Sequence, residues 1–520
     1  MSSRTTDAVA VTSADGVVDD GFAPLLPRWA VAGAAFVLAC ALVLRFLALS
    51  PLWLDEAQTV EIAGRSVPHL LDALRHDGSP PLYYLLLHVW MKIFGTGTFA
   101  VRALSGLISV AALPVMWRVA RVIGASRRDA WVATLLLAAN PFAIRYATET
   151  RMYSLVVLLW LLAFLAFRRV WLDRGVGWMV LAAAATAALV LTHYWSLFAV
   201  AAVGLAALAV VRRHRAAAVR VLVSLAVGCL GLLPWLSSFL FQLRHTGAPW
   251  GSPPSLSTVF LAPTSWAGEG PVGSDDLLAF AYYLLVGLAL FGTATATAVV
   301  VGGRPRKPAL WFLAVGFGTL LLGCGINLAL GSAYASRYSA VALVPFLLVA
   351  AAGLRSLPPR WWAPSLAVVL TLGIVVSAAL PARMRSEADE VAVALRAAKP
   401  HDVVVFCPDQ LGPAVHRLAP RAGQQVVFPT MGSPAMVDWV DYEQRNEAAD
   451  PSAFARSVLR RAGTAGAVWL VYADGYQTFS DDCSRLLIAI GTARGEPQIV
   501  VRSHKHVDER ERLAYFPPSG

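Results

Sequence analysis

The sequence is poor in charge. Only 14% of its 520 residues are Asp, Glu, Lys or Arg, whereas 57% are hydrophobic and the mean hydropathy is +0.61. A soluble domain of this composition is excluded, because the volume of a core grows too slowly with chain length to bury so much apolar surface. Apolar runs long enough to cross a bilayer recur between Trp29 and Leu380, and they predict membrane-spanning helices.

Several other sequence patterns are missing. The five cysteines include no CxxC pair and no metal-ligand spacing. The net charge of +11 is not accompanied by a Lys/Arg stripe interleaved with aromatic residues, so nucleic acid is not expected as a partner. No cleavage site follows the first apolar run, which is therefore interpreted as a retained helix and not as a signal peptide. No internal repeat is visible, and residues 1–28 are predicted to be a disordered cytoplasmic tail.

The basic residues predict the orientation of the chain. They gather in short loops between the apolar runs, and the positive-inside rule places every such loop in the cytoplasm. The clusters are Arg118–Arg128, Arg168–Arg174, Arg212–Arg220, Arg304–Lys307 and Arg355–Arg360. Two apolar runs separate the first helix from the first cluster, and only one of them can cross if all clusters are to stay inside. Pro81–Phe94 is the shorter run and begins with a Pro pair, so it is interpreted as a re-entrant or juxtamembrane helix.

This parity predicts eleven crossings, with the N-terminus cytoplasmic and the C-terminus outside. They are 29–49, 99–122, 130–146, 152–168, 177–194, 195–211, 218–240, 277–301, 309–330, 338–354 and 361–381. The predicted fold class is an all-α polytopic membrane bundle over residues 29–382, with an outer loop, 50–98, that carries juxtamembrane helices. The abundance of Ala, Arg and Gly suggests a bacterium, and hence its inner (plasma) membrane.

From residue 383 to residue 520 the composition is that of a soluble protein. Short β-rich runs alternate with helix-like stretches, which predicts a small extracytoplasmic α/β domain. The β-rich runs are Val403–Phe406, Val426–Phe428, Val468–Val471 and Ile499–Val501, and the helix-like stretches are Pro451–Arg461 and Cys483–Ile490. Cys407 and Cys483 both fall in this domain. In an oxidising compartment they form either a disulfide or two buried free thiols.

Three outer segments carry ionisable groups, which are costly at the mouth of a membrane bundle and therefore mark function. The first holds Asp55 and Glu56 directly after the first predicted helix. The second, Arg75–Tyr84, contains His76, Asp77 and Tyr83 around a Pro pair. The third, Tyr146–Tyr153, is a short turn that contains Glu149 and Arg151.

In this order and spacing, the three segments resemble the GT-C glycosyltransferases, in particular the branch of the protein O-mannosyltransferases and the lipid A aminoarabinose transferases. The resemblance covers residues 30–200 by motif and the remainder by hydropathy. It implies transfer of a sugar (mannose or another hexose or pentose) from a polyprenyl-phosphate donor, with inversion. The acceptor would be a hydroxyl of a cell-envelope glycan, glycolipid or protein. The eleven predicted crossings also agree with the O-mannosyltransferase pattern.

Such a reaction needs a base for the acceptor hydroxyl and positive charge for the phosphate that leaves. The resemblance implies that Asp55 is the base; Glu56 either orients Asp55 or the acceptor, or is solvated. The candidates for the phosphate are three arginines, which otherwise snorkel to lipid headgroups. The predicted donor-binding residues are Arg102, Arg151, Arg337, Glu149, His76, Asp77, Tyr83, Tyr153 and His193.

The third segment also bears on metals and cofactors. Metal-dependent relatives, such as the oligosaccharyltransferases, carry an Asp-x-Asp in this turn, whereas the present turn has Glu149 and Arg151. A guanidinium repels a metal ion, so we expect catalysis without a metal and without a cofactor. Ser79 stands where the aminoarabinose transferases carry a Lys, which puts lipid A in doubt as the acceptor.

Two other classes of function remain open from sequence. A polyprenyl-carrier flippase or transporter also has many helices, but it would place charges or helix-breaking Gly and Pro near the bilayer midplane. A cell-envelope assembly protein would leave the charges of Asp55, Arg102 and Arg151 unexplained.

Overall fold

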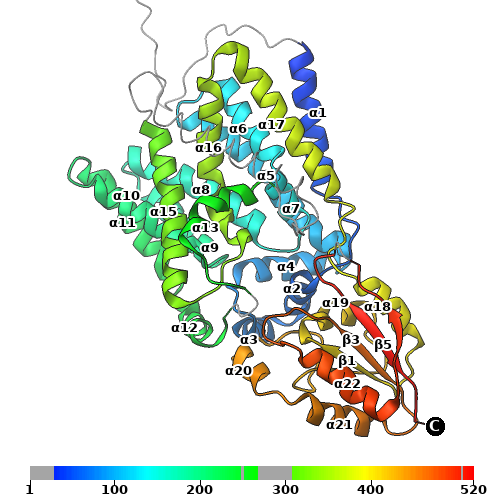
Figure 1. The fold of residues 1–520 in the computed structure, drawn as a ribbon. Coiled ribbons are helices and arrows are strands. Elements are labelled where there is room, and N and C mark those ends of the chain that lie inside the picture. The colour runs from blue at the N-terminus through cyan, green and yellow to red at the C-terminus, as the bar shows by residue number, and fades with distance from the viewer. Residues whose placement is uncertain (1–27, 248–250, 268–306, 505–506, 520) are drawn as a thin grey trace, which may run out of the picture.

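The computed structural model describes residues 28–247, 251–267, 307–504 and 507–519. A bundle of helices forms one part of the molecule and a smaller α/β domain the other, with the C-terminus at the far end of that domain (Figure 1). The predicted N-terminal tail up to residue 27, the predicted crossing 277–301 and the basic residues 304–306 lie outside the described residues. The predicted fold class, a polytopic helical bundle followed by a small α/β domain, is confirmed.

The bundle consists of helices of very different length. They are α1 (Arg28–Leu44), α5 (Thr98–Val122), α6 (Arg127–Ala138), α7 (Pro141–Ala147), α8 (Tyr153–Leu172), α9 (Val176–Val190), α10 (Ser196–Ala209), α11 (Arg215–Leu230), η1 (Leu233–Trp235), α12 (Leu236–His245), α13 (Leu256–Ser265), α15 (Lys307–Leu330), η2 (Ser336–Ser339), α16 (Ala340–Ser356) and α17 (Pro359–Ala379). Within the described residues, six helices have the length and apolar composition to cross a membrane, and four shorter helices are apolar. The number of eleven crossings stays a prediction.

One predicted crossing, 130–146, is two helices. α6 ends at Ala138, and the side chain of Asn140 then caps α7 by accepting a hydrogen bond from the backbone N–H of Ala143 at 2.9 Å. Pro141 occupies the first position of α7, where its missing N–H costs nothing and its fixed φ favours a helix start. The second helix leads directly into the turn that carries Glu149 and Arg151.

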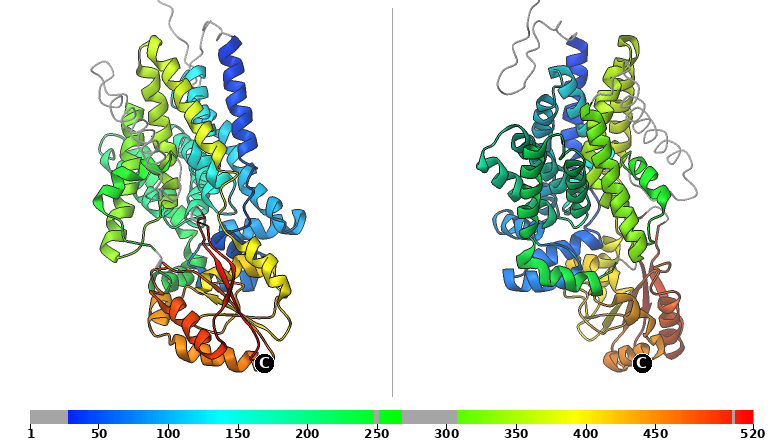
Figure 2. Two further views of the ribbon diagram at one scale, coloured as in Figure 1. Left: turned by 45° about the vertical axis from the view of Figure 1, so that its right-hand side comes forward. Right: turned by 90° about the vertical axis from the view of Figure 1, so that its left-hand side faces the viewer.

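The outer loop 50–98 folds into three helices. They are α2 (Leu54–Gly64), α3 (Val67–Asp77) and α4 (Leu82–Phe94), and they lie between the bundle and the C-terminal domain (Figures 1 and 2). The segment predicted to be a juxtamembrane helix is α4. Gly78 ends α3 with φ of 83°, and a Cβ at this position would lie 2.9 Å from Oγ1 of Thr246. Only glycine has both this conformation and this clearance at low cost.

The C-terminal domain is built on one mixed sheet. Its strands are β1 (Val403–Cys407), β2 (Gln424–Val427), β3 (Val468–Tyr472), β4 (Gln498–Val501) and β5 (Arg512–Phe516), in the order β2-β1-β3-β5-β4. β1 is parallel to β2 and β3, and β5 is antiparallel to β3 and β4. The helices are α18 (Ala388–Ala394), η3 (Leu395–Ala397), η4 (Asp409–Leu411), α19 (Gly412–Leu418), α20 (Tyr442–Glu447), α21 (Pro451–Ala462) and α22 (Asp482–Arg494).

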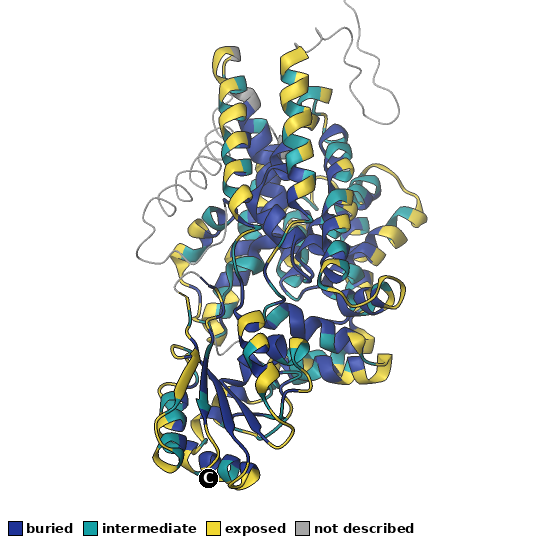
Figure 3. Cartoon of the chain, turned by 90° about the vertical axis from the view of Figure 1, so that its right-hand side faces the viewer, coloured by how far each residue is buried: buried dark blue, intermediate teal, exposed yellow. Residues whose placement is uncertain are grey.

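The centre of the sheet is covered on both faces. β1 and β3 are buried along their whole length, as parallel strands between two layers of helices are (Figure 3). Helices α21 and α22 pack against each other, and α18 packs on α19, which in turn contacts α2 of the outer loop. A disulfide joins Cys407 of β1 to Cys483 of α22, so of the two alternatives for this cysteine pair the structure has the disulfide.

Candidate active site

Asp55 lies in the first turn of α2, at the surface between the outer loop and the bundle. Its side chain is 16% exposed, and its Oδ2 atom is 3.4 Å from Nη2 of Arg337 and 3.7 Å from Nη2 of Arg151. Oδ2 accepts no hydrogen bond in the described part of the chain. The carboxylate is therefore enclosed by positive charge, and its Oδ2 atom is engaged by ion pairs without a hydrogen bond.

Arg151 is held in place by polar groups of α2 and α4. Its Nη1 atom donates to Oγ1 of Thr59 at 2.9 Å and to the hydroxyl of Tyr84 at 3.3 Å. Tyr84 in turn donates to Asp77 at 2.8 Å, and Asp77 also accepts a hydrogen bond from Gln58 at 2.6 Å. Burial raises the pKa of Tyr84, so its phenol stays protonated and keeps this donor role. Asp77 thus acts on the site through Tyr84.

Arg337 reaches the same carboxylate from η2. Its guanidinium lies 5.8 Å from the ring centre of Trp53 and 5.9 Å from that of Tyr338, which are cation–π distances. The indole N–H of Trp53 donates to Oε1 of Glu149 at 2.7 Å. Glu149 therefore orients the ring beside Arg337, and its second oxygen, Oε2, is buried without a hydrogen-bond partner among the described residues.

Glu56, the neighbour of Asp55, faces a different pair of arginines, Arg102 and Arg385, and is 0% exposed. It accepts hydrogen bonds from Nε and Nη2 of Arg102 at 2.8 and 2.5 Å and from the backbone N–H of Thr150 at 2.9 Å, and Arg385 lies 3.6 Å away. Burial alone would raise the pKa of Glu56, but the charge and hydrogen bonds of Arg102, the charge of Arg385 and the N–H of Thr150 together outweigh it and lower the pKa to about 2. The alternative that Glu56 is solvated is wrong.

All three nitrogens of the Arg102 guanidinium group donate hydrogen bonds inside the protein. Besides Glu56, it donates to the carbonyl oxygens of Ser50 at 2.8 Å and Pro51 at 3.0 Å, and it is buried. It therefore fixes the start of the outer loop against α5. The predicted contact of Arg102 with the donor phosphate stays a prediction, and this geometry does not favour it.

Two of the predicted donor-binding residues, His193 and Tyr153, belong to a group of aromatic rings that includes Tyr338, the neighbour of Arg337. The ring of His193 is 5.6 Å from that of Tyr153 and 5.3 Å from that of Tyr338, and all three side chains are buried or nearly so. The hydroxyl of Tyr153 has no hydrogen-bond partner among the described residues. These rings form the wall of the site against the bundle.

Two other predicted residues lie away from Asp55. His76 contacts Asp438 of the C-terminal domain at 2.9 Å, so it belongs to the seam between the outer loop and that domain. Tyr83 is fully buried, and its hydroxyl is hydrogen-bonded to Ser105 of α5 at 2.9 Å.

Sequence reasoning missed several residues of this arrangement. Trp53 and Tyr338 each stand within two residues of a predicted site residue, and Tyr84 stands in the quoted Pro-Pro-Leu-Tyr-Tyr segment, so proximity was an available signal. Arg385 had none. It follows the last helix of the bundle, and it donates to the backbone oxygen of Thr148 at 2.9 Å and to its hydroxyl at 2.6 Å.

The described residues contain no group of three or more His, Cys, Asp and Glu side chains that could hold a metal ion. Metal-independent catalysis stays a prediction, because the donor itself can carry ligands.

Comparisons with known proteins show which family and which solved structures the chain resembles. Residues 78–237 match the model of the dolichyl-phosphate-mannose-protein mannosyltransferase family. Searching the curated proteins by sequence gave no match.

Solved structures resemble the chain over nearly its full length. Two are crystal structures of ArnT from Cupriavidus metallidurans. The form bound to undecaprenyl phosphate has 13% sequence identity and a TM-score of 0.57, and the apo form has 14% and 0.58; each alignment covers 94% of this chain and 98% of ArnT. The arabinofuranosyltransferase AftD from Mycobacteria, solved by cryo-EM, has 14% identity and a TM-score of 0.53 over 96% of this chain and 40% of AftD.

The resemblance inferred from the three outer segments is thereby confirmed. The chain has the GT-C glycosyltransferase fold, and its residues 78–237 match the dolichyl-phosphate-mannose-protein mannosyltransferase family.

Proposed function

We propose that this protein transfers a sugar from a polyprenyl-phosphate donor to an acceptor hydroxyl, with Asp55 as the general base. The observation that carries the proposal is the partly exposed carboxylate of Asp55 between the guanidinium groups of Arg151 and Arg337. A base with two permanent positive charges within 4 Å of it supplies the groups that this reaction needs. The fold and the undecaprenyl phosphate bound to ArnT support a lipid-linked donor.

The chemistry uses these groups in one displacement. Asp55 takes the proton of the acceptor hydroxyl as the acceptor oxygen attacks the anomeric carbon. The bond from that carbon to the phosphate oxygen breaks with its electron pair, and polyprenyl phosphate leaves with the added negative charge. Attack opposite the leaving group inverts the anomeric centre. Arg151 and Arg337 stabilise the charge that grows on the leaving oxygen.

The same arginines give the donor a role in preparing the base. Both guanidinium groups face Oδ2 of Asp55 and hold it in a charge pair. A phosphate has more charge and more acceptor oxygens than a carboxylate. In the proposed complex the donor phosphate draws Arg151 and Arg337 toward itself and leaves Asp55 to accept the proton. Asp77 and Glu149 contribute by holding Tyr84 and Trp53, the side chains next to the two arginines.

The positive-inside rule supports an extracytoplasmic site, because the Arg168–Arg174 cluster lies at the opposite end of α8 from Tyr153. The disulfide between Cys407 and Cys483 supports the same side for the C-terminal domain, since disulfides persist in oxidising compartments. The matched family favours mannose as the sugar. The proposed acceptor is a cell-envelope glycan, glycolipid or protein, and the proposed location is a bacterial inner membrane.

The proposal is tested with the purified protein and a panel of polyprenyl-phosphate sugars. We expect release of free polyprenyl phosphate from one of them, dependent on an acceptor with a free hydroxyl. If labelled lipid-linked sugar instead crosses a vesicle membrane without cleavage, the protein is a flippase and the proposal is refuted.

A further inference from the structure

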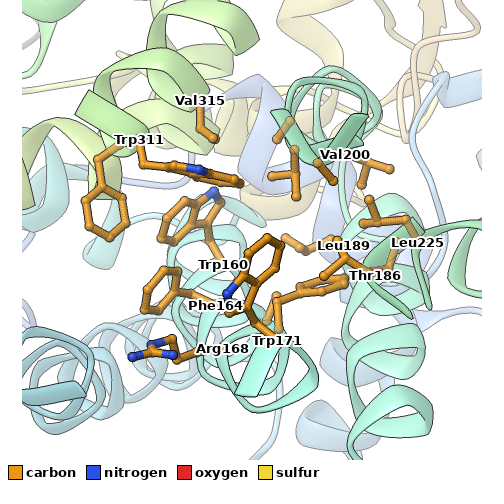
Figure 4. A pocket seen from close by; sticks show the side chains of 17 residues that line it. Trp160, Phe164, Arg168, Trp171, Thr186, Leu189, Val200, Leu225, Trp311 and Val315 are labelled. Carbon is orange, nitrogen blue, oxygen red and sulfur yellow. The ribbon is translucent and has the colours of Figure 1, made fainter. Parts of the chain in front are cut away.

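An apolar cavity lies inside the bundle, away from Asp55. Its volume is about 200 Å³, and aromatic side chains of α8 and α15 dominate its lining (Figure 4). These are Trp160, Phe164, Phe167, Trp171, Trp311 and Phe312. The polar side chains among the lining residues are Thr186 and Arg168, and the hydroxyl of Thr186 is occupied by the backbone oxygen of Ala182 at 2.9 Å.

The charged edge of the cavity lies at the end of the bundle opposite the candidate active site. α8 begins at Tyr153, beside Arg151, and ends at Leu172. At a rise of 1.5 Å per residue, Arg168 lies roughly 22 Å along the helix from Tyr153. A ligand with its charged group at Arg168 therefore has that group near the far surface of the bundle, and not at Asp55.

Arg168 is the charged group at the edge of this cavity. Its guanidinium lies beyond the aromatic rings (Figure 4), and it makes no ion pair or hydrogen bond with any described residue. The neighbouring basic residues are engaged: Arg169 lies over the ring of Trp178, and Arg220 donates to the backbone oxygens of Val170 and Trp171. An unengaged cation beside an apolar cavity is complementary to an amphipathic anion.

We propose that this cavity binds an anionic phospholipid of the leaflet opposite Asp55, with one acyl chain among the tryptophans and the headgroup phosphate on Arg168. Two features select this occupant. The basic clusters Arg168–Arg174 and Arg212–Arg220 make this face of the bundle positive, and basic pockets between membrane helices attract anionic headgroups. The lining is apolar apart from Arg168 and Thr186, as an acyl chain requires.

The test uses the full-length protein in detergent and phosphatidylglycerol against phosphatidylcholine with the same chains. Native mass spectrometry counts retained lipids for the wild type, for Arg168→Gln and for Arg174→Gln. Arg174 is an exposed residue of the same basic cluster that does not line the cavity, so it is the matched control. We expect the wild type to prefer phosphatidylglycerol. Arg168→Gln should lose roughly fivefold in affinity for it, the scale of one charge at a membrane surface, and Arg174→Gln should lose little.

A second measurement locates the lipid. Phosphatidylglycerol with brominated chains should quench tryptophan fluorescence in the wild type, and less in Trp171→Phe or in Arg168→Gln. Equal affinity for the two lipids, or equal losses in Arg168→Gln and Arg174→Gln, would overturn the proposal. So would displacement of the bound phosphatidylglycerol by undecaprenyl phosphate at equal concentration, because the occupant would then be the polyprenyl carrier. These readouts do not involve sugar transfer and are independent of the proposed function.

Discussion

Replacing Arg102 with Met separates a structural role from a role in binding the donor. Arg102 is buried, and two of its nitrogens donate to Glu56, which has no contact with solvent. The substitution keeps most of the side-chain volume but removes the charge. Glu56 would then retain the N–H of Thr150 at 2.9 Å and Arg385 at 3.6 Å. The carbonyls of Ser50 and Pro51 would also lose a donor.

The expected cost follows from the burial of the pair. Removing one partner of a buried ion pair destabilises a protein by about 3–5 kcal/mol, because the other charge stays behind unpaired. Glu56→Gln should cost a similar amount for the same reason. The double variant should be less destabilised than the sum of the two single variants, because neither charge is then left alone.

The assay is thermal unfolding in detergent for both single variants and the double variant, with Arg118→Met on the same helix as a control. Arg118 is half-buried, and its substitution should change the stability by less than about 1 kcal/mol. In Arg102→Met the melting temperature should fall well below that of the control. An unchanged melting temperature together with a raised KM for the donor would refute the structural role and make Arg102 a phosphate ligand, as the sequence had suggested.

Three further predictions concern metal, orientation and pH. Transfer should survive EDTA, because Arg151 stands where metal-dependent relatives carry an acid; loss of turnover that manganese or magnesium restores would contradict this. In a background without Cys40, Cys229 and Cys324, a cysteine at the exposed position Glu447 should react with an impermeant thiol reagent from outside, and one at Arg174 should not; the reverse labelling would invert the orientation. Burial raises the pKa of Glu509, which accepts a hydrogen bond from the backbone N–H of Leu54, from 4.5 to about 8. The contribution of Glu509 to the free energy of unfolding is therefore complete below pH 4.5, where its carboxyl group is protonated in the folded and the unfolded protein, and it is lost as the pH rises through about 8. The melting temperature should fall over this pH range, and it should fall less in Glu509→Gln. Equal pH profiles for the two proteins would rule this out.

The pattern of apolar runs and basic loops was sufficient for the fold class, because both follow from the bilayer. The pattern was insufficient to predict the break between α6 and α7 at Asn140 and Pro141. The hydropathy of the apolar run 130–146 is the same whether one helix continues through it or a cap interrupts it. Strand β5 was also missed, because the charged residues Arg510, Glu511 and Arg512, of which the last begins the strand, resemble a loop.

The candidate site shows the same division. The sequence identified Asp55, Arg151 and Arg337 as charges at one face of the bundle, and the structure brings these three together. The choice of Asp55 over Glu56 came from the resemblance, because the residues alone do not show which groups two adjacent side chains of a helix face. Nor could the sequence connect Arg385 with Glu56, which is separated from it by more than three hundred residues and lies 3.6 Å away.

The most direct test of the account is the transfer rate of Asp55→Asn, measured with the donor that the panel identifies. The substitution keeps the size of the side chain and removes its capacity to accept the proton. We expect the rate to fall by at least ~10²-fold, with a melting temperature near that of the wild type and with donor binding retained, because Arg151 and Arg337 remain. A folded Asp55→Asn variant that transfers sugar at the wild-type rate would contradict the assignment of Asp55 as the base.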